Sequence, residues 1–255
     1  ASIQFPRPYM IDAERGAENP QYVDALERSG GVYWSTTDLD EIIAEVMSLM
    51  TERHEYRTLV IDPMTIPYNT ACDNAAREIA ARAQDPRIDG TEYGRHKGVA
   101  DRKMKRLAAL LLQLDMNVII TSHSKIKWVK VGNEFKESGT TFDCYYKLEY
   151  LFDLVLEVQR RGQDRVAVAR KSRLESFPDG DVFPFTYRAV AERYGNLLLE
   201  RQAEVVAMAS TEQVGRLSQL TGILKVEPEV IEKWCAEHAA ENARRNGAGA
   251  FVDPV

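Results

Sequence analysis

Cysteine is scarce in this sequence: there are three among 255 residues, and they stand far apart at Cys72, Cys144 and Cys235. None of them forms a CxxC pair or another metal-binding spacing, which argues against a zinc module and against a disulfide-stapled secreted scaffold. We interpret the three as reduced thiols of a protein that works in a reducing compartment.

Long apolar runs and an excess of positive charge are also missing. No stretch approaches the roughly 20 residues that span a membrane, and the start, ASIQFPRPYMID, lacks the charged and apolar regions of a signal peptide. We therefore expect no membrane association. The net charge of −6 argues against a surface coated with nucleic acid, so any contact with DNA has to come from a local basic patch.

What the sequence does contain is an alternation of short apolar strands with amphipathic helices. The helix at 39–50, for example, has Leu39, Ile42, Ile43 and Val46 on one face. Unbroken apolar strands separated by helices are typical of a parallel sheet that is covered on both faces. The fold class is therefore α/β with a mostly parallel central sheet. We predict strands at 8–12, 31–34, 58–62 and 117–121, and helices at 39–50, 71–83 and about 97–114.

The pattern changes beyond residue 124. Residues 124–140 are polar and basic, with Gly132-Asn133 as a hairpin turn. Segments 151–158 and 165–173 alternate as antiparallel strands do, and we expect them at an edge of the sheet. The predicted division of the chain is a core at 1–195, a link at 196–209, a small helical module at 210–240 and a tail at 241–255.

Carboxylates follow two of the predicted strands. Glu14 lies just beyond the first strand, and Asp62 ends the third. Ligands of open parallel sheets bind beyond the carboxyl ends of the strands. Nucleotide hydrolases use one acid there to hold Mg²⁺ and another to polarise the attacking water. The alternative is that a strand ends in an acid simply because the chain re-enters solvent.

The fourth strand ends in Thr121-Ser122-His123. If the strands are neighbours, Ser122 and His123 lie beside both acids, where they could bond a phosphate and report its presence to the following loop. The alternative is a histidine with an ordinary place on the surface.

A basic segment with one aromatic residue follows directly. Cations of this kind hold phosphates, and an indole ring can stack on a base of single-stranded DNA. The alternative is a solvated hairpin whose tryptophan packs on the domain. The residues are Lys125, Lys127, Trp128 and Lys130.

Several of these segments resemble one family in the same order along the chain. Residues 9–14 (YMIDAE), with Asn19-Pro20-Gln21-Tyr22 beyond, resemble the RecA segment that carries the catalytic glutamate. Residues 59–62 resemble a Walker B strand, and 118–123 resemble the strand whose last polar residue senses the γ-phosphate. Residues 165–173 are similar to a late strand with two basic residues. Over residues 1–195 the chain is most similar to the RecA-like AAA-family ATPases of bacteriophages.

The resemblance implies a RecA-like P-loop NTPase core with ATP and Mg²⁺ as cofactors. Glu14 would activate water, Asp62 would hold magnesium, and Ser122 and His123 would sense phosphate. Lys171 and Arg173 would reach the nucleotide of a neighbouring subunit, which implies a homo-oligomer, either a ring or a filament. The expected activity is ATP-dependent recombination or annealing of single-stranded DNA in the cytoplasm of a bacterial host.

The sequence departs from this family at one point, because no GxxxxGK[ST] motif occurs in it. That loop cradles phosphate with backbone N–H groups and a lysine. In the family it precedes the strand that residues 8–12 resemble and is joined to it by a helix. Residues 1–5 look like the last turn of that helix, so we expect the chain to begin inside a longer protein. Two alternatives remain: a non-catalytic DNA-binding or assembly scaffold, and a helicase-like or packaging ATPase.

Overall fold

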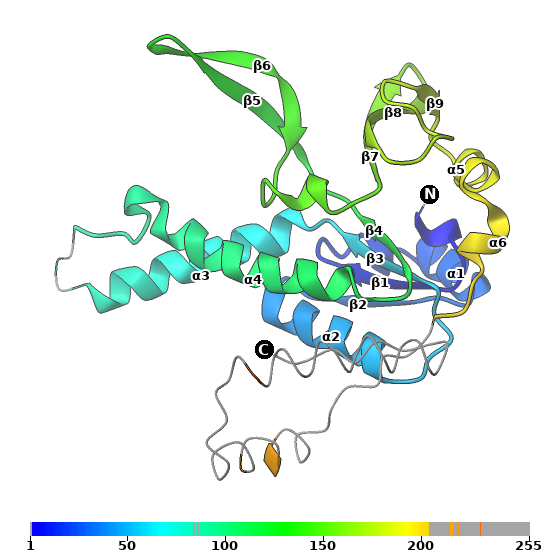
Figure 1. Ribbon diagram of the computed structural model, residues 1–255, viewed down its shortest axis with the longest axis horizontal. Coiled ribbons are helices and arrows are strands. Elements are labelled where there is room, and N and C mark those ends of the chain that lie inside the picture. Colours follow the sequence, from blue (N-terminus) through cyan, green and yellow to red (C-terminus); the bar gives the residue numbers. More distant parts are fainter. Residues whose placement is uncertain are drawn as a thin grey trace.

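A computed structural model describes residues 2–83, 85 and 87–203, together with Gly215, Arg216, Gln219 and Val230. At its centre lies a four-stranded parallel sheet in the order β2-β1-β3-β4 (Figure 1). The strands are β1 (Pro8–Asp12), β2 (Val32–Ser35), β3 (Thr58–Asp62) and β4 (Asn117–Ile120). The predicted α/β fold with a parallel central sheet is confirmed, and each strand lies within one residue of its predicted bounds.

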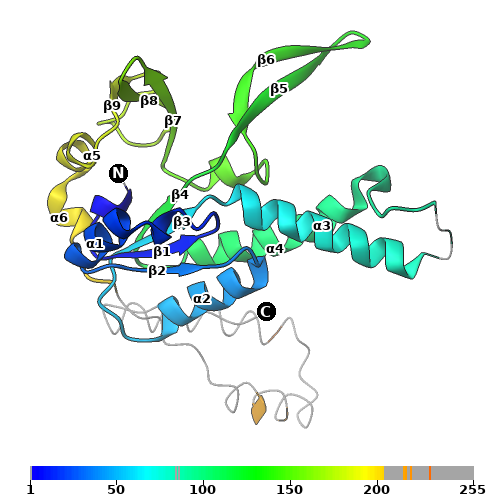
Figure 2. The ribbon, with the colours of Figure 1, turned by 180° about the vertical axis from the view of Figure 1, so that it is seen from behind.

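Helices cover one face of this sheet. Ile11 and Ile61 are fully buried against α2 (Leu39–Thr51), α3 (Thr65–Arg82) and α4 (Arg95–Leu111). Figure 2 shows α2 running along the lower side of the sheet. Because side chains alternate along a strand, Met10, Val60 and Ile119 point to the other face. There they pack with Ile3 of the 3₁₀ turn η1 (Ser2–Gln4) and Ala17 of η2 (Gly16–Glu18). Both faces are covered, which explains the unbroken apolar strands.

Helix α2 illustrates why these segments become helices. Asp38 caps its start by accepting a hydrogen bond from Asp40 N at 2.7 Å, which satisfies a backbone donor that has no partner within the helix. Four side chains at helical spacing, Leu39, Ile42, Ile43 and Val46, are all buried in the core. Each contributes about 1.5–3 kcal/mol when it leaves water.

Helix α1 (Pro20–Arg28) is not among the sequence predictions. Its signals are Asn19, which accepts a hydrogen bond from Gln21 N at 3.2 Å, and Pro20 in its first turn. The chain then turns into β2 at Gly31, where a Cβ atom would lie 2.5 Å from the Pro8 carbonyl oxygen. Glycine therefore allows β2 to approach β1 closely.

The antiparallel strands are present, but their placement differs from the expectation that they extend an edge of the parallel sheet. Strands β5 (Ser124–Val131) and β6 (Glu134–Phe142) form a two-stranded ribbon, which we call the arm. Strands β7 (Leu154–Arg161), β8 (Asp164–Ser172) and β9 (Val182–Pro184) form a separate three-stranded sheet. This small sheet buries Ala167, Phe177 and Phe183 in a cluster of its own, so it needs no place on the larger sheet.

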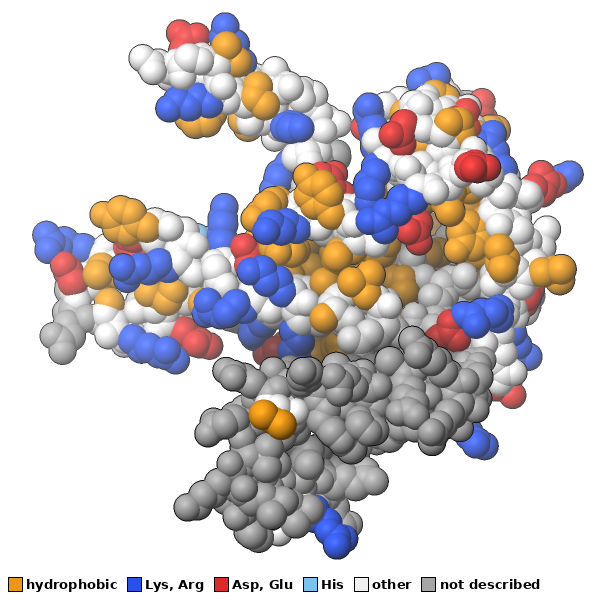
Figure 3. Space-filling view, viewed as in Figure 1, with side chains coloured by type: hydrophobic (Ala, Val, Ile, Leu, Met, Phe, Trp, Pro, Cys, Tyr) orange, Lys and Arg blue, Asp and Glu red, His pale blue; other side chains and the backbone are white. Residues whose placement is uncertain are grey.

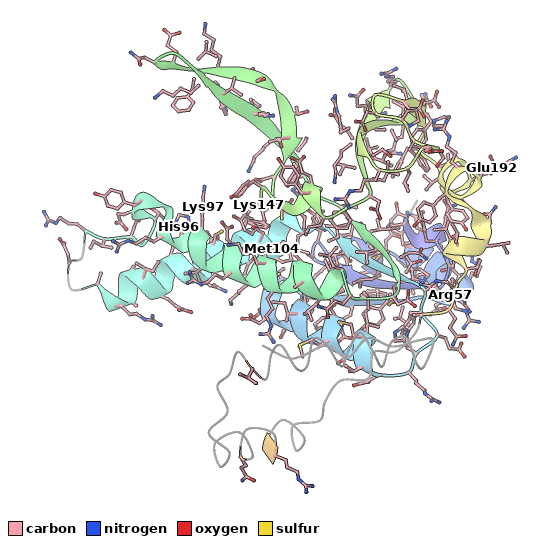
Figure 4. The ribbon with its side chains drawn as sticks, viewed as in Figure 1. Arg57, His96, Lys97, Met104, Lys147 and Glu192 are labelled. Carbon is pink, nitrogen blue, oxygen red and sulfur yellow. The ribbon has the colours of Figure 1, made fainter. Side chains whose placement is uncertain are left out.

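The end of the described chain packs back on the sheet, at the edge opposite to the candidate site. Helix α5 (Tyr187–Tyr194) leads into α6 (Asn196–Leu199). Asn117 Nδ2 donates to the Leu199 carbonyl oxygen at 2.8 Å, and Arg57 donates to the Glu200 carbonyl oxygen; Figure 4 labels Arg57 beside α6. Two 3₁₀ turns, η3 (Glu92–Gly94) and η4 (Leu148–Tyr150), complete the described elements.

The predicted helical module at 210–240 and the tail at 241–255 lie outside the described residues, apart from the four single positions named above. Of the predicted link at 196–209, the described part begins as α6 and continues to residue 203. Within the described part of the chain, none of the helices has both the length and the apolar character that crossing a bilayer requires.

Candidate functional site

The strand-end residues singled out in the sequence meet at one edge of the sheet. Asp12 of β1 is in register with Asp62 of β3, and Ile61 is in register with Ile120 of β4. All these strands are parallel, so Glu14, Asp62 and the segment 121–123 leave the sheet at its carboxyl edge. The first, third and fourth predicted strands are neighbours in the sheet, which is the condition under which Ser122 and His123 were expected to lie beside both acids.

Glu14 and His123 are in direct contact. The Oε1 atom of Glu14 lies 2.8 Å from Nε2 of His123, and the two side chains are 49% and 50% exposed. The strands that precede them are separated in the sheet by β3, so the two loops meet over the end of that strand. The Glu14 carboxylate is accessible to solvent, as a group that accepts a proton from a water molecule has to be.

Asp12 has a different role from Glu14. It is 2% exposed, and its two carboxylate oxygens accept hydrogen bonds from Glu14 N at 3.1 Å and Ala17 N at 2.7 Å. Ala13 N also donates to the Asp62 carbonyl oxygen at 2.9 Å. These bonds fix the backbone turn that presents the Glu14 side chain, so Asp12 is a positioning residue.

Asp62 lies partly buried at the end of β3 and accepts a hydrogen bond from the Thr121 hydroxyl. Within the described residues no group of three or more His, Cys, Asp or Glu side chains forms a metal cage. Magnesium is usually held by one or two carboxylates together with water and substrate phosphates, rather than by a cage made only of protein. The oxygen donors of Asp62 and Thr121 fit that kind of site.

Thr65 is the site residue that sequence reasoning missed. It begins α3 and is 2% exposed. Its Oγ1 atom lies 2.9 Å from Ser122 Oγ and accepts a hydrogen bond from His123 N at 2.9 Å. The buried hydroxyl therefore holds the segment that carries Ser122 and His123. The sequence did contain a signal for Thr65: it follows the strand-end acid Asp62 by three residues. At that distance the first turn of the next helix faces the carboxyl edge of the sheet.

Lys171 and Arg173 do not join this group within the chain. The ammonium group of Lys171 donates to the carbonyl oxygens of Glu149 and Phe152, each at 2.8 Å. Arg173 donates to the Tyr150 carbonyl oxygen at 2.9 Å and to Asp153 Oδ1 at 3.3 Å. Their proposed role at a neighbouring subunit stays a prediction, and Lys171 would have to leave two carbonyls to perform it.

The arm carries the four predicted DNA-binding residues away from the body of the protein (Figures 1 and 3). Trp128 is 55% exposed, which argues against the packed position that the alternative gives it. Lys127 and Lys130 are exposed, whereas Lys125 pairs with Asp143 at 2.7 Å. Just beyond the arm, Lys147 lies with its Nζ atom 5.4 Å from the centroid of the Tyr146 ring (Figure 4). DNA binding itself is not tested by these contacts.

The two described cysteines are free and buried, which agrees with their interpretation as reduced thiols. Burial raises the pKa of the Cys144 thiol to about 12 and also raises the pKa of Cys72. A raised pKa keeps both sulfurs protonated near neutral pH, and a protonated thiol is a poor nucleophile. Cys235 lies outside the described residues.

The geometry described above agrees with a comparison of the sequence with known families. A family model described as an AAA domain matches residues 1–183. The chain belongs to this family of P-loop AAA-type ATPases. The match includes the parallel sheet, the arm and most of the three-stranded sheet, and it makes the chain an AAA-family ATPase domain. No curated protein matches the chain.

Proposed function

We propose that this AAA domain hydrolyses ATP and couples the reaction to binding of single-stranded DNA, in phage recombination or annealing within the cytoplasm of a bacterial host. The observation that carries the proposal is the contact between Glu14 and His123. It joins an accessible carboxylate, at the edge where parallel sheets bind ligands, to the residue that immediately precedes the arm.

Glu14 is the proposed general base. Its carboxylate accepts a proton from water as the water oxygen attacks the γ-phosphorus atom in line with the leaving oxygen. In the described state that carboxylate is engaged by His123. A γ-phosphate oxygen is a competing partner for the imidazole, so occupation of the site would free Glu14 to orient water. Ser122, tied to Thr65, would donate to the same phosphate.

We assign Asp62 and Thr121 as the residues that would bind Mg²⁺, either directly or through water molecules. When bound, the metal ion neutralises charge on the phosphates. The reaction also requires a phosphate cradle, and this sequence contains no GxxxxGK[ST] motif. ATP hydrolysis should therefore be measured with the protein encoded by the complete gene. We propose that the phosphate-binding loop of that protein precedes β1.

The root of the arm connects this chemistry to DNA. The His123 carbonyl oxygen accepts a hydrogen bond from Asp143 N at 2.7 Å, so the residues before β5 and after β6 are joined. Beyond the root, Cys144 and Tyr145 are buried in the main core. A movement of His123 would therefore shift the arm relative to a fixed base, and binding at the arm would in turn move His123.

Assembly completes the proposal. Lys171 and Arg173 are assigned to the nucleotide of an adjacent subunit in a ring or filament. Arg173 is the easier of the two to release, because its side chain is 56% exposed and its ion pair with Asp153 lies at the surface.

A second candidate function is a DNA-binding or assembly scaffold without catalysis, which would be favoured if the complete gene also encodes no GxxxxGK[ST] motif upstream of this sequence. A third is a helicase-like or packaging ATPase. The deciding experiment measures phosphate release from ATP by the protein of the complete gene, with and without single-stranded DNA. Phosphate release that single-stranded DNA stimulates supports the proposal. Absence of ATP hydrolysis supports the scaffold. Hydrolysis that only duplex DNA stimulates supports the helicase-like or packaging ATPase.

A further inference from the structure

The register of the arm sorts its side chains onto two faces. Residues directly opposite each other in an antiparallel ribbon share a face. Trp128 pairs with Glu137, and Lys130 pairs with Phe135. Alternation along β5 places Ile126 with Trp128 and Lys130. We call this side the aromatic face: Ile126, Trp128, Lys130, Phe135 and Glu137.

The other side of the ribbon, which we call the opposite face, has a different composition. Val129 pairs with Lys136, and Val131 pairs with Glu134. A bulge lies between Ile126 and Trp128, where β6 places Ser138 and Gly139 against Lys127. This face contains no aromatic ring at the paired positions 129, 131, 134 and 136. The four arm residues predicted from sequence are therefore divided between two surfaces.

The aromatic face is exposed to an unusual degree. Phe135 is 68% exposed, Trp128 55% and Ile126 49%. Large apolar side chains gathered on a projecting element mark an interaction site, because each would be stabilised by leaving water. Figure 3 shows hydrophobic and basic side chains next to each other along the arm.

We propose that the aromatic face is the base-stacking surface of the arm, with a nucleobase of single-stranded DNA held between Trp128 and Phe135. The inference rests on the proposed DNA-binding function and adds Phe135, which sequence reasoning did not select. Trp128 and Phe135 are diagonal neighbours across the ribbon, so their positions are about 7–8 Å apart. Bases stack at about 3.4 Å, so one base with a ring on each side needs about twice that spacing.

Lys130 provides the matching charge. It lies directly opposite Phe135 and is exposed to solvent. A nucleic acid brings a phosphate next to each base. A base within a duplex is already stacked on both sides, so the same geometry selects single strands.

The test compares matched substitutions on the two faces by fluorescence anisotropy of a labelled oligothymidylate, using the protein of the complete gene. Phe135→Ala and its control Val131→Ala remove exposed side chains near the same turn, one on each face. We expect Phe135→Ala to weaken binding roughly 5- to 150-fold, the effect of one lost base stack. Val131→Ala should leave the affinity unchanged. Thermal unfolding of both variants checks that the fold is retained.

A second comparison separates bases from phosphates. On an oligonucleotide of abasic residues, Phe135→Ala should have no effect, while Lys130→Ala should still weaken binding more than Lys136→Ala does. Equal effects of Phe135→Ala and Val131→Ala, or an effect of Phe135→Ala that persists without bases, would overturn the assignment. A change of oligomeric state with unchanged DNA affinity would also overturn it, in favour of an interface between copies. If the unaltered protein binds no DNA at low salt, the proposed function fails as well.

Discussion

The Nε2 atom of His123 lies 2.8 Å from Oε1 of Glu14, across the end of the strand that carries Asp62. His123 is also the last residue before the arm, and its carbonyl oxygen accepts a hydrogen bond from Asp143 N, just after the returning strand β6. One residue therefore touches the proposed catalytic base with its side chain and the base of the arm with its backbone. The predictions below test separate parts of this connection.

Thr65→Val should disturb the connection without removing a proposed catalytic group. The substitution removes the oxygen that accepts from His123 N and bonds Ser122. We expect a loss of about 1 kcal/mol in the free energy of unfolding, because a partly buried N–H group loses its hydrogen-bond partner. Stimulation of ATP hydrolysis by single-stranded DNA should fall. Thr65→Ser keeps the hydroxyl and should restore both the stability and the stimulation by DNA. Failure to restore them would contradict the positioning role of Thr65.

Asp12→Asn should destabilise the protein more than Glu14→Gln does. The buried Asp12 carboxylate accepts from two backbone N–H groups, and an amide can offer only one oxygen to them. We expect a loss of about 1–3 kcal/mol, measured by urea denaturation. Glu14 is half exposed, and its substitution should change stability by less than about 0.5 kcal/mol. Equal losses would mean that the turn does not depend on Asp12.

The Cys144 thiol should resist alkylation in the folded protein. Its pKa is raised to about 12 by burial, so almost no thiolate exists at pH 8. The pKa is higher in the folded than in the unfolded chain, so the folded state retains the proton, and the stability from this group falls as pH rises from about 9 towards 12. Mass spectrometry of iodoacetamide-treated protein should find Cys144 unmodified until urea is added. Rapid modification without urea would show that the site opens.

Lys171→Met separates the two roles of this residue. If Lys171 serves only its own chain, the loss of its bonds to the Glu149 and Phe152 carbonyls lowers stability and leaves ATP hydrolysis per folded molecule unchanged. If it acts on a neighbour's nucleotide, hydrolysis falls, and mixing with Glu14→Gln subunits restores part of it, because some interfaces then combine an intact Glu14 with an intact Lys171. Arg173→Met, measured in the same way, serves as the companion variant. Loss that mixing does not restore would contradict the role in trans.

The parallel core was predictable because its strands are short apolar runs whose neighbours must be helices, and strand-end acids in parallel strands share an edge. Register explains why Glu14, Asp62 and His123 converge. Their contacts were not predictable, because they depend on how two loops curve over β3. Thr65 was missed for the same reason: its bonds to residues 122 and 123 join segments far apart in sequence.

The antiparallel strands show another limit of sequence patterns. Alternation in 151–158 and 165–173 indicates strands with one apolar face, but it does not indicate which surface that face covers. In the protein it covers Phe177 and Phe183, which lie later in the chain. The arm is a further case, since the spacing of Lys125, Lys127, Trp128 and Lys130 gives no register, and only pairing with β6 shows that Phe135 shares a face with Trp128.

The central claim is that Glu14 activates the water that attacks ATP. The direct measurement is steady-state phosphate release by the protein of the complete gene, with saturating single-stranded DNA, for the unaltered protein, Glu14→Gln and Glu18→Gln. Glu18 is a matched control, because it lies in the same loop and its side chain is likewise 49% exposed. We predict that Glu14→Gln lowers kcat by about 10²- to 10⁴-fold with ATP binding retained, while Glu18→Gln has no effect. Undiminished hydrolysis by Glu14→Gln would contradict the account.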